Sequence, residues 1–149
     1  MATTQEQNKA LVLQFYSEVW NRGNLDFIKR AVSPNFIDHP PQRPFSVPIR
    51  GQEALTEAVT AFRKAMPDYH DAPIQVIAEN DRVVYLGRVT GTHTNNFFQF
   101  PPKGGKLNFS TINFYRLQDG LIAEQWNIFG VMDMMQQMGL MPAPGAGAH

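Results

Sequence analysis

The sequence offers one adjacent pair of titratable residues where a predicted strand ends at a proline. Asp38 and His39 directly precede Pro40. Because neighbouring residues of a strand point to opposite faces, only one of the two can face an interior. A histidine titrates near neutral pH and suits general acid or base catalysis. We therefore predict that His39 lines a cavity as a catalytic residue, with Asp38 as the lesser candidate. The alternative is a pair that anchors a loop.

Three further side chains could carry chemistry. His93 ends a predicted strand, where it could move a proton or polarise a carbonyl. Asp68 follows a predicted helix and could act as a base if burial raised its pKa. Each also has a structural interpretation, since His93 could hold the turn after it and Asp68 could be a cap or turn residue. Glu124 is better explained by pairing with Arg88 or Arg116 across a sheet.

Composition excludes several classes of function. The chain has 149 residues, 13 basic and 13 acidic, and no cysteine. A balanced charge without a basic stripe argues against nucleic-acid binding. No HxH or HxxxH spacing supports a metal, and we predict neither metal nor cofactor. The sequence has no apolar run near the roughly 18 residues of a membrane span, and its first eight residues are too polar for a signal peptide, so we predict a cytoplasmic protein.

Hydrophobic periodicity predicts an α+β fold, because helices come first and a meander of strands follows. Helices are predicted over residues 5–21, 25–32, 51–66 and 131–138. Strands are predicted over 35–38, 74–79, 82–93, 106–117 and 121–129. Asp119-Gly120 is a hairpin turn signal, since both residues tolerate positive φ. Large side chains on both faces of the long strands predict a highly curved, mainly antiparallel sheet with helices on one face.

The remaining segments are loops or a tail. Residues 39–50 contain four prolines, which exclude a regular helix or a central strand. We predict that this segment lies over the domain as a lid or rim. We expect a single domain over residues 1–140 and a disordered tail over 141–149.

Two motifs and their spacing carry a family resemblance. Residues 91–105 read GTHTNNFFQFPPKGG and residues 119–126 read DGLIAEQW. They resemble the G-T-H-x-G-x-F-x-G-x-P-P-T-G and D-G-K-I-x-E-x-W patterns of the SnoaL-like polyketide cyclases, or ester cyclases. Residues 136–139 (QQMG) are similar to that family's closing Q-L-G. The resemblance covers about residues 8 to 140.

The resemblance implies a fold and a mechanism. The family has a cone-shaped α+β barrel of the nuclear-transport-factor-2 superfamily, with an apolar pocket and homodimers through the sheet. Its cyclases use an aspartate four residues after the tryptophan as acid and base for an aldol closure, without a metal or cofactor. Ketosteroid isomerases share this barrel and carry their catalytic aspartate just before a proline at a similar place, which His39 would occupy here.

Several positions depart from the family pattern. Gly130 stands where the family has its aspartate, and a glycine cannot carry a proton. The turn glycines are replaced by Asn95 and Gln99, and the threonine before the last glycine by Lys103. The family's aldol mechanism therefore cannot be transferred unchanged.

Seven aromatic residues and one methionine are predicted as pocket wall, and about four of the eight should touch the cavity: Tyr16, Trp20, Met66, Phe97, Phe100, Phe114, Trp126 and Phe129. Gly130 would leave additional space for a substrate. Such a wall suits an apolar ring-shaped ligand. We predict a cofactor-independent cyclase or isomerase acting on a hydrophobic polyketide- or terpenoid-like molecule. The alternative is a non-catalytic binding or carrier protein, motivated by Gly130. A protein-interaction role is a third interpretation without specific support.

Overall fold

The computed structural model describes residues 4–39 and 48–142, and its helices lie close to the predicted positions. Helix α1 (Thr4–Phe15) continues as a π-helical segment, Tyr16–Asn21, so the predicted first helix is one run with a wider last turn. A 3-10 turn (Leu25–Phe27) leads into α2 (Ile28–Ala31). Helix α3 spans Gly51–Ala65, and the short α4 spans Val131–Gln137.

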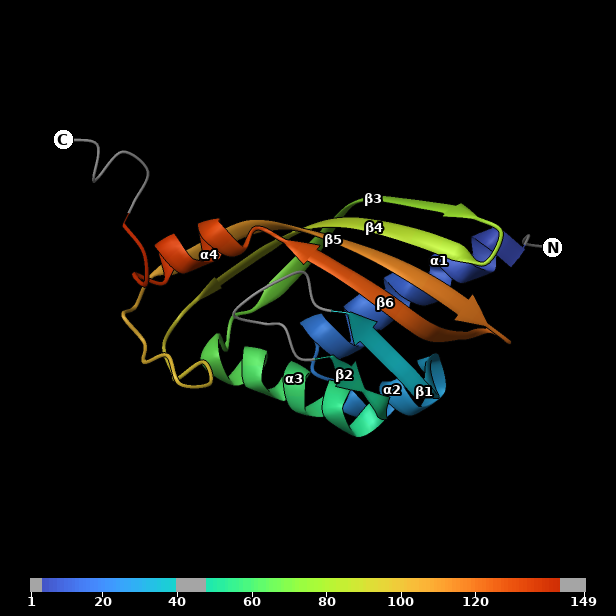
Figure 1. The fold of residues 1–149 in the computed structure, drawn as a ribbon, viewed down its shortest axis with the longest axis horizontal. Coiled ribbons are helices and arrows are strands. Elements are labelled where there is room, and N and C mark those ends of the chain that lie inside the picture. The colour runs from blue at the N-terminus through green and yellow to red at the C-terminus, as the bar shows by residue number, and fades with distance from the viewer. Residues whose placement is uncertain (1–3, 40–47, 143–149) are drawn as a thin grey trace.

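Six strands form one curved, unclosed sheet (Figure 1). Their order is β2-β1-β6-β5-β4-β3, and every neighbouring pair is antiparallel except β1 and β6. The strands are β1 (Val32–His39), β2 (Ile49–Arg50), β3 (His70–Glu79), β4 (Arg82–Thr92), β5 (Lys106–Gln118) and β6 (Leu121–Phe129). The α+β prediction is confirmed.

The long strands are joined by the tight turns that the sequence predicts. Asp119 and Gly120 have φ of 52° and 75°, and Asn80 has φ of 54° in the turn from β3 to β4. In the loop between β4 and β5, positive φ falls on Phe98 at 51° and on Gly104 at 71°. The strained Phe98 lies next to Gln99, which the family pattern had marked.

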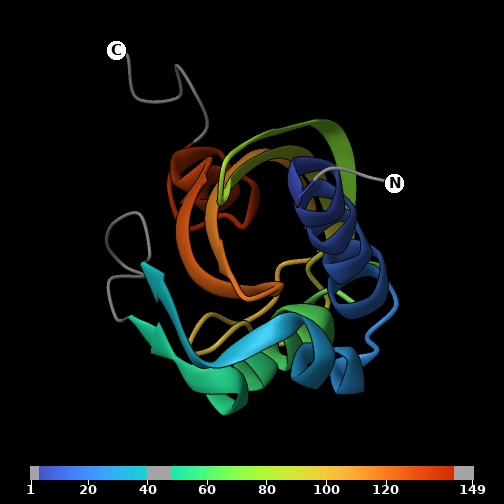
Figure 2. The ribbon, with the colours of Figure 1, turned by 90° about the vertical axis from the view of Figure 1, so that its right-hand side faces the viewer.

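Helices α1 and α3 lie along the concave side of the sheet, which Figure 2 shows end-on as an open curve. Helix α1 packs against β3 and β4, and α3 packs against β1 and β2. Two hydrophobic clusters result. One gathers around Phe15, Tyr85 and Tyr115, and the other around Met66 and Met134. Trp20 packs against both clusters, which places it where the two meet.

The convex face of the sheet carries several exposed apolar side chains. Its exposed side chains include Ile74, Ile77, Ile112, Phe114 and Ile128. Such a surface is compatible with pairing between copies, and the homodimer stays a prediction. None of the described helices is both long and apolar enough to cross a membrane. Residues 40–47 of the predicted lid and residues 143–149 of the predicted tail lie outside the described residues.

Candidate functional site

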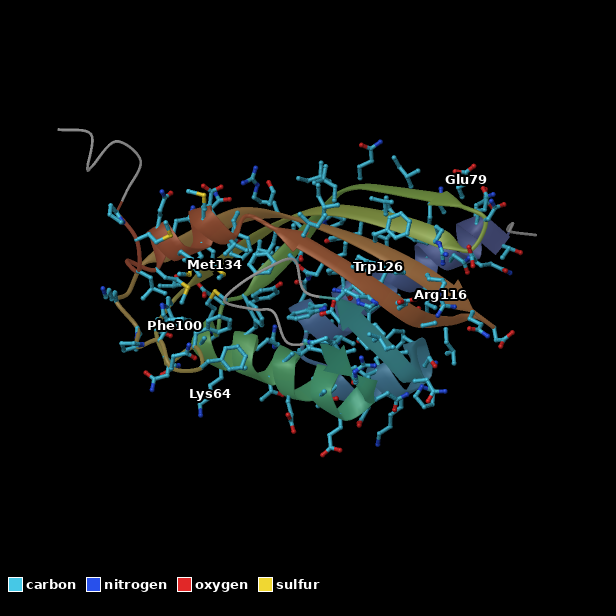
Figure 3. The ribbon with its side chains drawn as sticks, in the orientation of Figure 1. Lys64, Glu79, Phe100, Arg116, Trp126 and Met134 are labelled. Carbon is cyan, nitrogen blue, oxygen red and sulfur yellow. The ribbon has the colours of Figure 1, made fainter. Side chains whose placement is uncertain are left out.

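A cavity of about 510 Å³ opens between the concave face of the sheet, α3 and the loop between β4 and β5. Its exposed lining residues mark the mouth, and they are Pro48, Glu57, Phe98 and Gln99. Its walls are apolar and rich in aromatic residues, among them Trp20, Phe62, Phe100, Phe109 and Phe129. Figure 3 shows Phe100 near the end of α3 that carries Lys64. The lining also includes buried polar residues, which we call the floor: Tyr16, Asp38, Asp71, Thr111, Asn113 and Gln125. The site is therefore an apolar pocket with a polar floor.

Asp38 stands at one end of this floor. Strand β1 runs parallel to β6 and sets Asp38 opposite Gln125, which brings its carboxyl to the concave face. The residue is 7% exposed, and its buried Oδ1 has no hydrogen-bond partner among the described residues. Burial raises the pKa of Asp38 to about 7, against a smaller lowering by the charge of His39. This carboxyl can therefore gain and lose a proton near neutral pH.

Asp71 stands at the other end of the floor. It is also buried, but its backbone and its carboxylate both make hydrogen bonds. Its backbone N–H donates to Oδ1 of Asn21 at 2.7 Å, and Asn21 Nδ2 donates back to the carbonyl of Asp71 at 2.9 Å. The hydroxyl of Tyr85 donates to Oδ1 of Asp71 at 2.8 Å. Burial raises the pKa of Asp71 to about 7, while hydrogen bonds from Tyr85 and Tyr69 lower it. A Cβ on Gly87 would collide with this carboxylate, so the glycine makes room for it.

Amides and hydroxyls connect the floor between the two carboxyls. Gln125 Nε2 donates to Oδ1 of Asn113 at 3.3 Å, and Asn113 Nδ2 donates to the hydroxyl of Tyr16. The hydroxyls of Tyr16 and Tyr115 lie 2.5 Å apart. Tyr16 also stacks on Tyr85, with ring centroids 3.7 Å apart. We call this row of side chains, from Asp38 through Gln125, Asn113, Tyr16 and Tyr85 to Asp71, the polar band.

The structure places His39 outside the cavity lining. Its Nε2 lies 2.7 Å from Oε2 of Glu124, and its ring stacks on Trp126. The predicted pair of Glu124 with Arg116 is present at 3.1 Å. Trp126 and Arg116 are labelled in Figure 3. Since β1 alternates, the side chain that turns inward is that of Asp38, and His39 takes the other face.

His93 and Asp68 also lie away from the cavity lining. His93 is 1% exposed, and its backbone exchanges hydrogen bonds with Gly104 and Gly105 across the turn. Burial lowers the pKa of His93, more than a contact with the backbone of Asn95 raises it. Asp68 is exposed and accepts hydrogen bonds from the backbone and hydroxyl of Thr92, which lower its pKa. The geometry of Asp68 fits its structural interpretation as a turn residue. At His93 only the backbone bridges the turn, because both ring nitrogens are buried without a hydrogen-bond partner among the described residues.

Four of the eight predicted wall residues line the cavity, namely Tyr16, Trp20, Phe100 and Phe129. Met66 and Phe97 are buried in the neighbouring hydrophobic cluster instead. Phe114 and Trp126 pack against each other on the convex side. Gly130 precedes α4, where its N–H donates to the carbonyl of Ser110, and it is not among the lining residues.

Sequence reasoning missed Asp71, Asn113 and Gln125. Asp71 had been assigned to a loop, whereas β3 already begins at His70. A signal was present for Asn113, which shares the inward alternation of β5 with Thr111 and Tyr115. Amides at positions that alternate with a hydrophobic core usually face partners or a ligand. In the described part of the chain, no cluster of three His, Asp or Glu side chains could hold a metal, and the absence of a cofactor stays a prediction.

Comparisons with known proteins agree with the fold. The SnoaL-like polyketide cyclase family model matches residues 10–138. A Jannaschia sp. CCS1 structure assigned as a SnoaL-like polyketide cyclase is 22% identical, with 95% of this chain and 98% of that chain covered and a TM-score of 0.85. A Bacillus cereus protein assigned as a polyketide cyclase is 27% identical, with coverages of 94% and 87% and a TM-score of 0.76. AclR from Streptomyces galilaeus, assigned as a hydroxylase, is 25% identical, with coverages of 94% and 85% and a TM-score of 0.79. No curated protein matches significantly.

Proposed function

Because the chain belongs to the SnoaL-like polyketide cyclase family, we propose that it is a cofactor-independent cyclase or isomerase that moves a proton through Asp38. Its substrate in this proposal is a hydrophobic polyketide- or terpenoid-like molecule that contains a carbonyl group. One observation carries the proposal: a buried carboxyl with an unpartnered oxygen faces a cavity rich in aromatic residues. A buried polar atom without a protein partner in a cavity suggests that a ligand supplies one.

The chemistry follows from the position of this carboxyl. Asp38 as a carboxylate would take a proton from the carbon next to the substrate carbonyl, and negative charge would develop on the carbonyl oxygen. Amide and hydroxyl groups of the polar band are the hydrogen-bond donors available for that charge. In an isomerisation Asp38 would return the proton to another carbon. In a cyclisation the enolate carbon would bond to a second carbonyl, whose oxygen would receive the proton from Asp38.

A pKa near 7 suits this role. A general acid or base works best when its pKa lies near the working pH, because both protonation states are then populated. Asp38 could thus supply the proton-carrying group that Gly130 removes from the family position, from a different strand. The aromatic walls would hold the substrate in a reactive pose, which by itself can contribute a large part of a rate enhancement.

The carrier interpretation predicts a cavity without titratable side chains. Two buried carboxyls line this cavity, Asp38 and Asp71. Burying a carboxyl costs free energy, and a protein that only carries apolar ligands gains nothing from it. This contrast favours the enzyme. The carrier remains the alternative outcome of the experiment below.

The experiment uses 2-tetralone, a two-ring ketone with acidic protons beside its carbonyl. NMR in D₂O follows the replacement of those protons by deuterium, which reports proton abstraction without knowledge of the natural substrate. We expect the wild-type protein to accelerate the exchange and Asp38→Asn to reduce the acceleration by about 10²-fold or more, the usual contribution of a general base.

Asp119→Asn is the matched control. Asp119 is an exposed residue of the β5–β6 turn, and asparagine tolerates its positive φ, so exchange should remain at the wild-type rate. Absence of wild-type acceleration, or an Asp38→Asn variant as fast as wild type, would contradict the proposal and favour the carrier.

A further inference from the structure

The lining of the cavity is unbalanced in charge. Its described residues include three carboxyls, Asp38, Glu57 and Asp71, and no lysine, arginine or histidine. Glu57 is exposed at the mouth, where solvent screens it, whereas the two aspartates are 7% and 2% exposed. An anionic group at the floor would therefore be desolvated next to carboxyls with no cation to pair with. A buried charge without a partner is strongly unfavourable.

The unpartnered polar atoms of the cavity share one chemical character. Two lining residues have a buried side-chain oxygen without a hydrogen-bond partner in the described chain, Oδ1 of Asp38 and Oδ1 of Asn127. They come from β1 and β6, which are neighbouring strands. Both atoms are acceptors, so their complement is an O–H or N–H donor on the ligand. If the side-chain amide of Asn127 rotates by 180°, it presents its N–H₂ group instead of its oxygen. Asn127 therefore fixes where the polar group of a ligand lies, whereas the carboxyls determine which ligand charge is accepted.

The two halves of the cavity fix the orientation of the ligand. Phe98 is exposed at the mouth and Phe100 is half-buried, whereas every residue of the polar band is almost fully buried. A ligand with an apolar ring body and a polar head would bury both only if the head enters first. A volume of about 510 Å³ lies within the usual range for a ligand of drug-like size.

We infer that this site takes an uncharged or cationic ring compound whose head carries an O–H or N–H donor, and that it rejects carboxylates, phosphates and other anions. The inference rests on the proposed function only in using the same cavity. Free acids would thus be poor substrates, whereas the matching alcohols and amines would be good ligands.

Three naphthalene probes with the same carbon skeleton test the charge preference. They are naphthalen-2-ylmethanol, naphthalen-2-ylmethylammonium and naphthalene-2-carboxylate, and calorimetry or intrinsic fluorescence at pH 8 measures their dissociation constants. We expect the alcohol and the ammonium compound to bind at least about tenfold more tightly than the carboxylate, because burial of an unpaired anion beside carboxyls is unfavourable.

Two variants locate the origin of the preference. Asp38→Asn should reduce the advantage of the ammonium compound over the carboxylate by about tenfold, since it removes a buried charge. Glu53→Gln is the matched control on the exposed side of α3, outside the cavity lining, and it should change that ratio by less than about twofold. Asn127→Leu should weaken the alcohol but leave the charge preference in place.

Carboxylate binding as tight as that of the alcohol would overturn the inference. So would failure of all three probes to bind up to their solubility limits, since the cavity is large enough for two fused rings. If the probes show the charge preference but the protein does not accelerate 2-tetralone exchange, the inference stands and the proposed catalytic function fails.

Discussion

Asp38 and Asp71 are two carboxyls in the same cavity whose surroundings differ in one respect. Both are almost fully buried, and burial raises the pKa of each to about 7. Asp71 receives hydrogen bonds from Tyr85 and Tyr69, and its backbone is tied to Asn21. Asp38 has a buried oxygen with no partner in the described residues. The two carboxyls thus have similar pKa values but different roles. Asp71 has a structural role, whereas Asp38 has an oxygen that a ligand could hydrogen-bond.

This difference shows how proton chemistry and structure can be told apart. A carboxyl whose oxygens already accept hydrogen bonds stabilises the elements around it, and its removal leaves donors unsatisfied. A carboxyl that is desolvated without donors destabilises the fold and is retained where a ligand uses it. Activity and stability should therefore respond in opposite ways to the same substitution at the two positions.

The largest expected effect is on proton transfer. Asp38→Asn should lower the rate of 2-tetralone exchange by about 10²-fold or more, whereas Asp71→Asn should lower it by less than about tenfold. The physical reason is that only Asp38 has an oxygen free to take a proton from a ligand. NMR in D₂O measures both variants in parallel. An equal loss of exchange rate in the two variants would mean that both carboxyls take part in proton transfer. It would contradict the different roles given to Asp38 and Asp71.

The next effect is on stability and its pH dependence. A raised pKa means that the folded state holds the Asp38 proton more tightly than the unfolded state does. Asp38 therefore weakens the fold as pH rises from about 4 to above 7. Asp38→Asn should raise the free energy of unfolding at pH 8 by up to about 4 kcal/mol and leave it nearly unchanged at pH 4.

Asp71→Asn provides the contrast in the same measurement. At pH 5, where protonation spares most of the ionisation cost, this variant should lose about 1–3 kcal/mol, because an amide N–H₂ would face a tyrosine donor. Urea unfolding at the three pH values determines both variants. A stabilised Asp71→Asn variant at pH 5 would contradict a structural role for Asp71.

A substitution at Gly87 disturbs Asp71 and its partner Tyr85 without touching Asp38. Gly87→Ala would force its Cβ against the Asp71 carboxylate and the Tyr85 ring, and we expect a loss of about 1–3 kcal/mol in stability. The exchange rate should stay within about tenfold of wild type, since Asp38 is not touched. Gly130→Ala is the control, because the atoms nearest to its Cβ would be the Asp133 side chain at 3.3 Å and Phe109 at 3.6 Å, with a cost within about 0.5 kcal/mol.

The smallest effect concerns His39. Its charge lowers the pKa of Asp38, so His39→Gln should move the acid limb of the exchange profile to higher pH. The rate above pH 8 should stay within about twofold of wild type, because the ring lies outside the cavity lining. A large loss on that plateau would instead restore His39 as a catalytic residue.

Local patterns predicted most of the fold. Apolar spacing placed α1 and α3, and Asp119-Gly120 placed the β5–β6 hairpin, because these features depend on neighbours in the chain. Strand β1 was predicted too short, and β3 was predicted to begin at Ile74 rather than His70. Their added residues pair with distant strands, which local propensity does not register.

The site was less predictable than the fold. Alternation shows that Asp38 and His39 face opposite ways, but it does not say which of them faces inward. The pairing of β1 with β6 decides this, and the two residues are far apart in sequence from their partners. For the same reason the aromatic residues divide between cavity, core and convex face in a way that composition could not foresee.

By itself the sequence determined an α+β fold of one family and an aromatic-rich interior, since these depend on residue type, order and spacing. That Gly130 replaces a family aspartate stays a prediction. Only the tertiary structure decided that Asp38 faces the cavity, that tyrosines hold Asp71, and that no cationic side chain joins them among the described lining residues. Burial and partnership arise between strands that meet only after folding, and they set the pKa and the availability of each carboxyl.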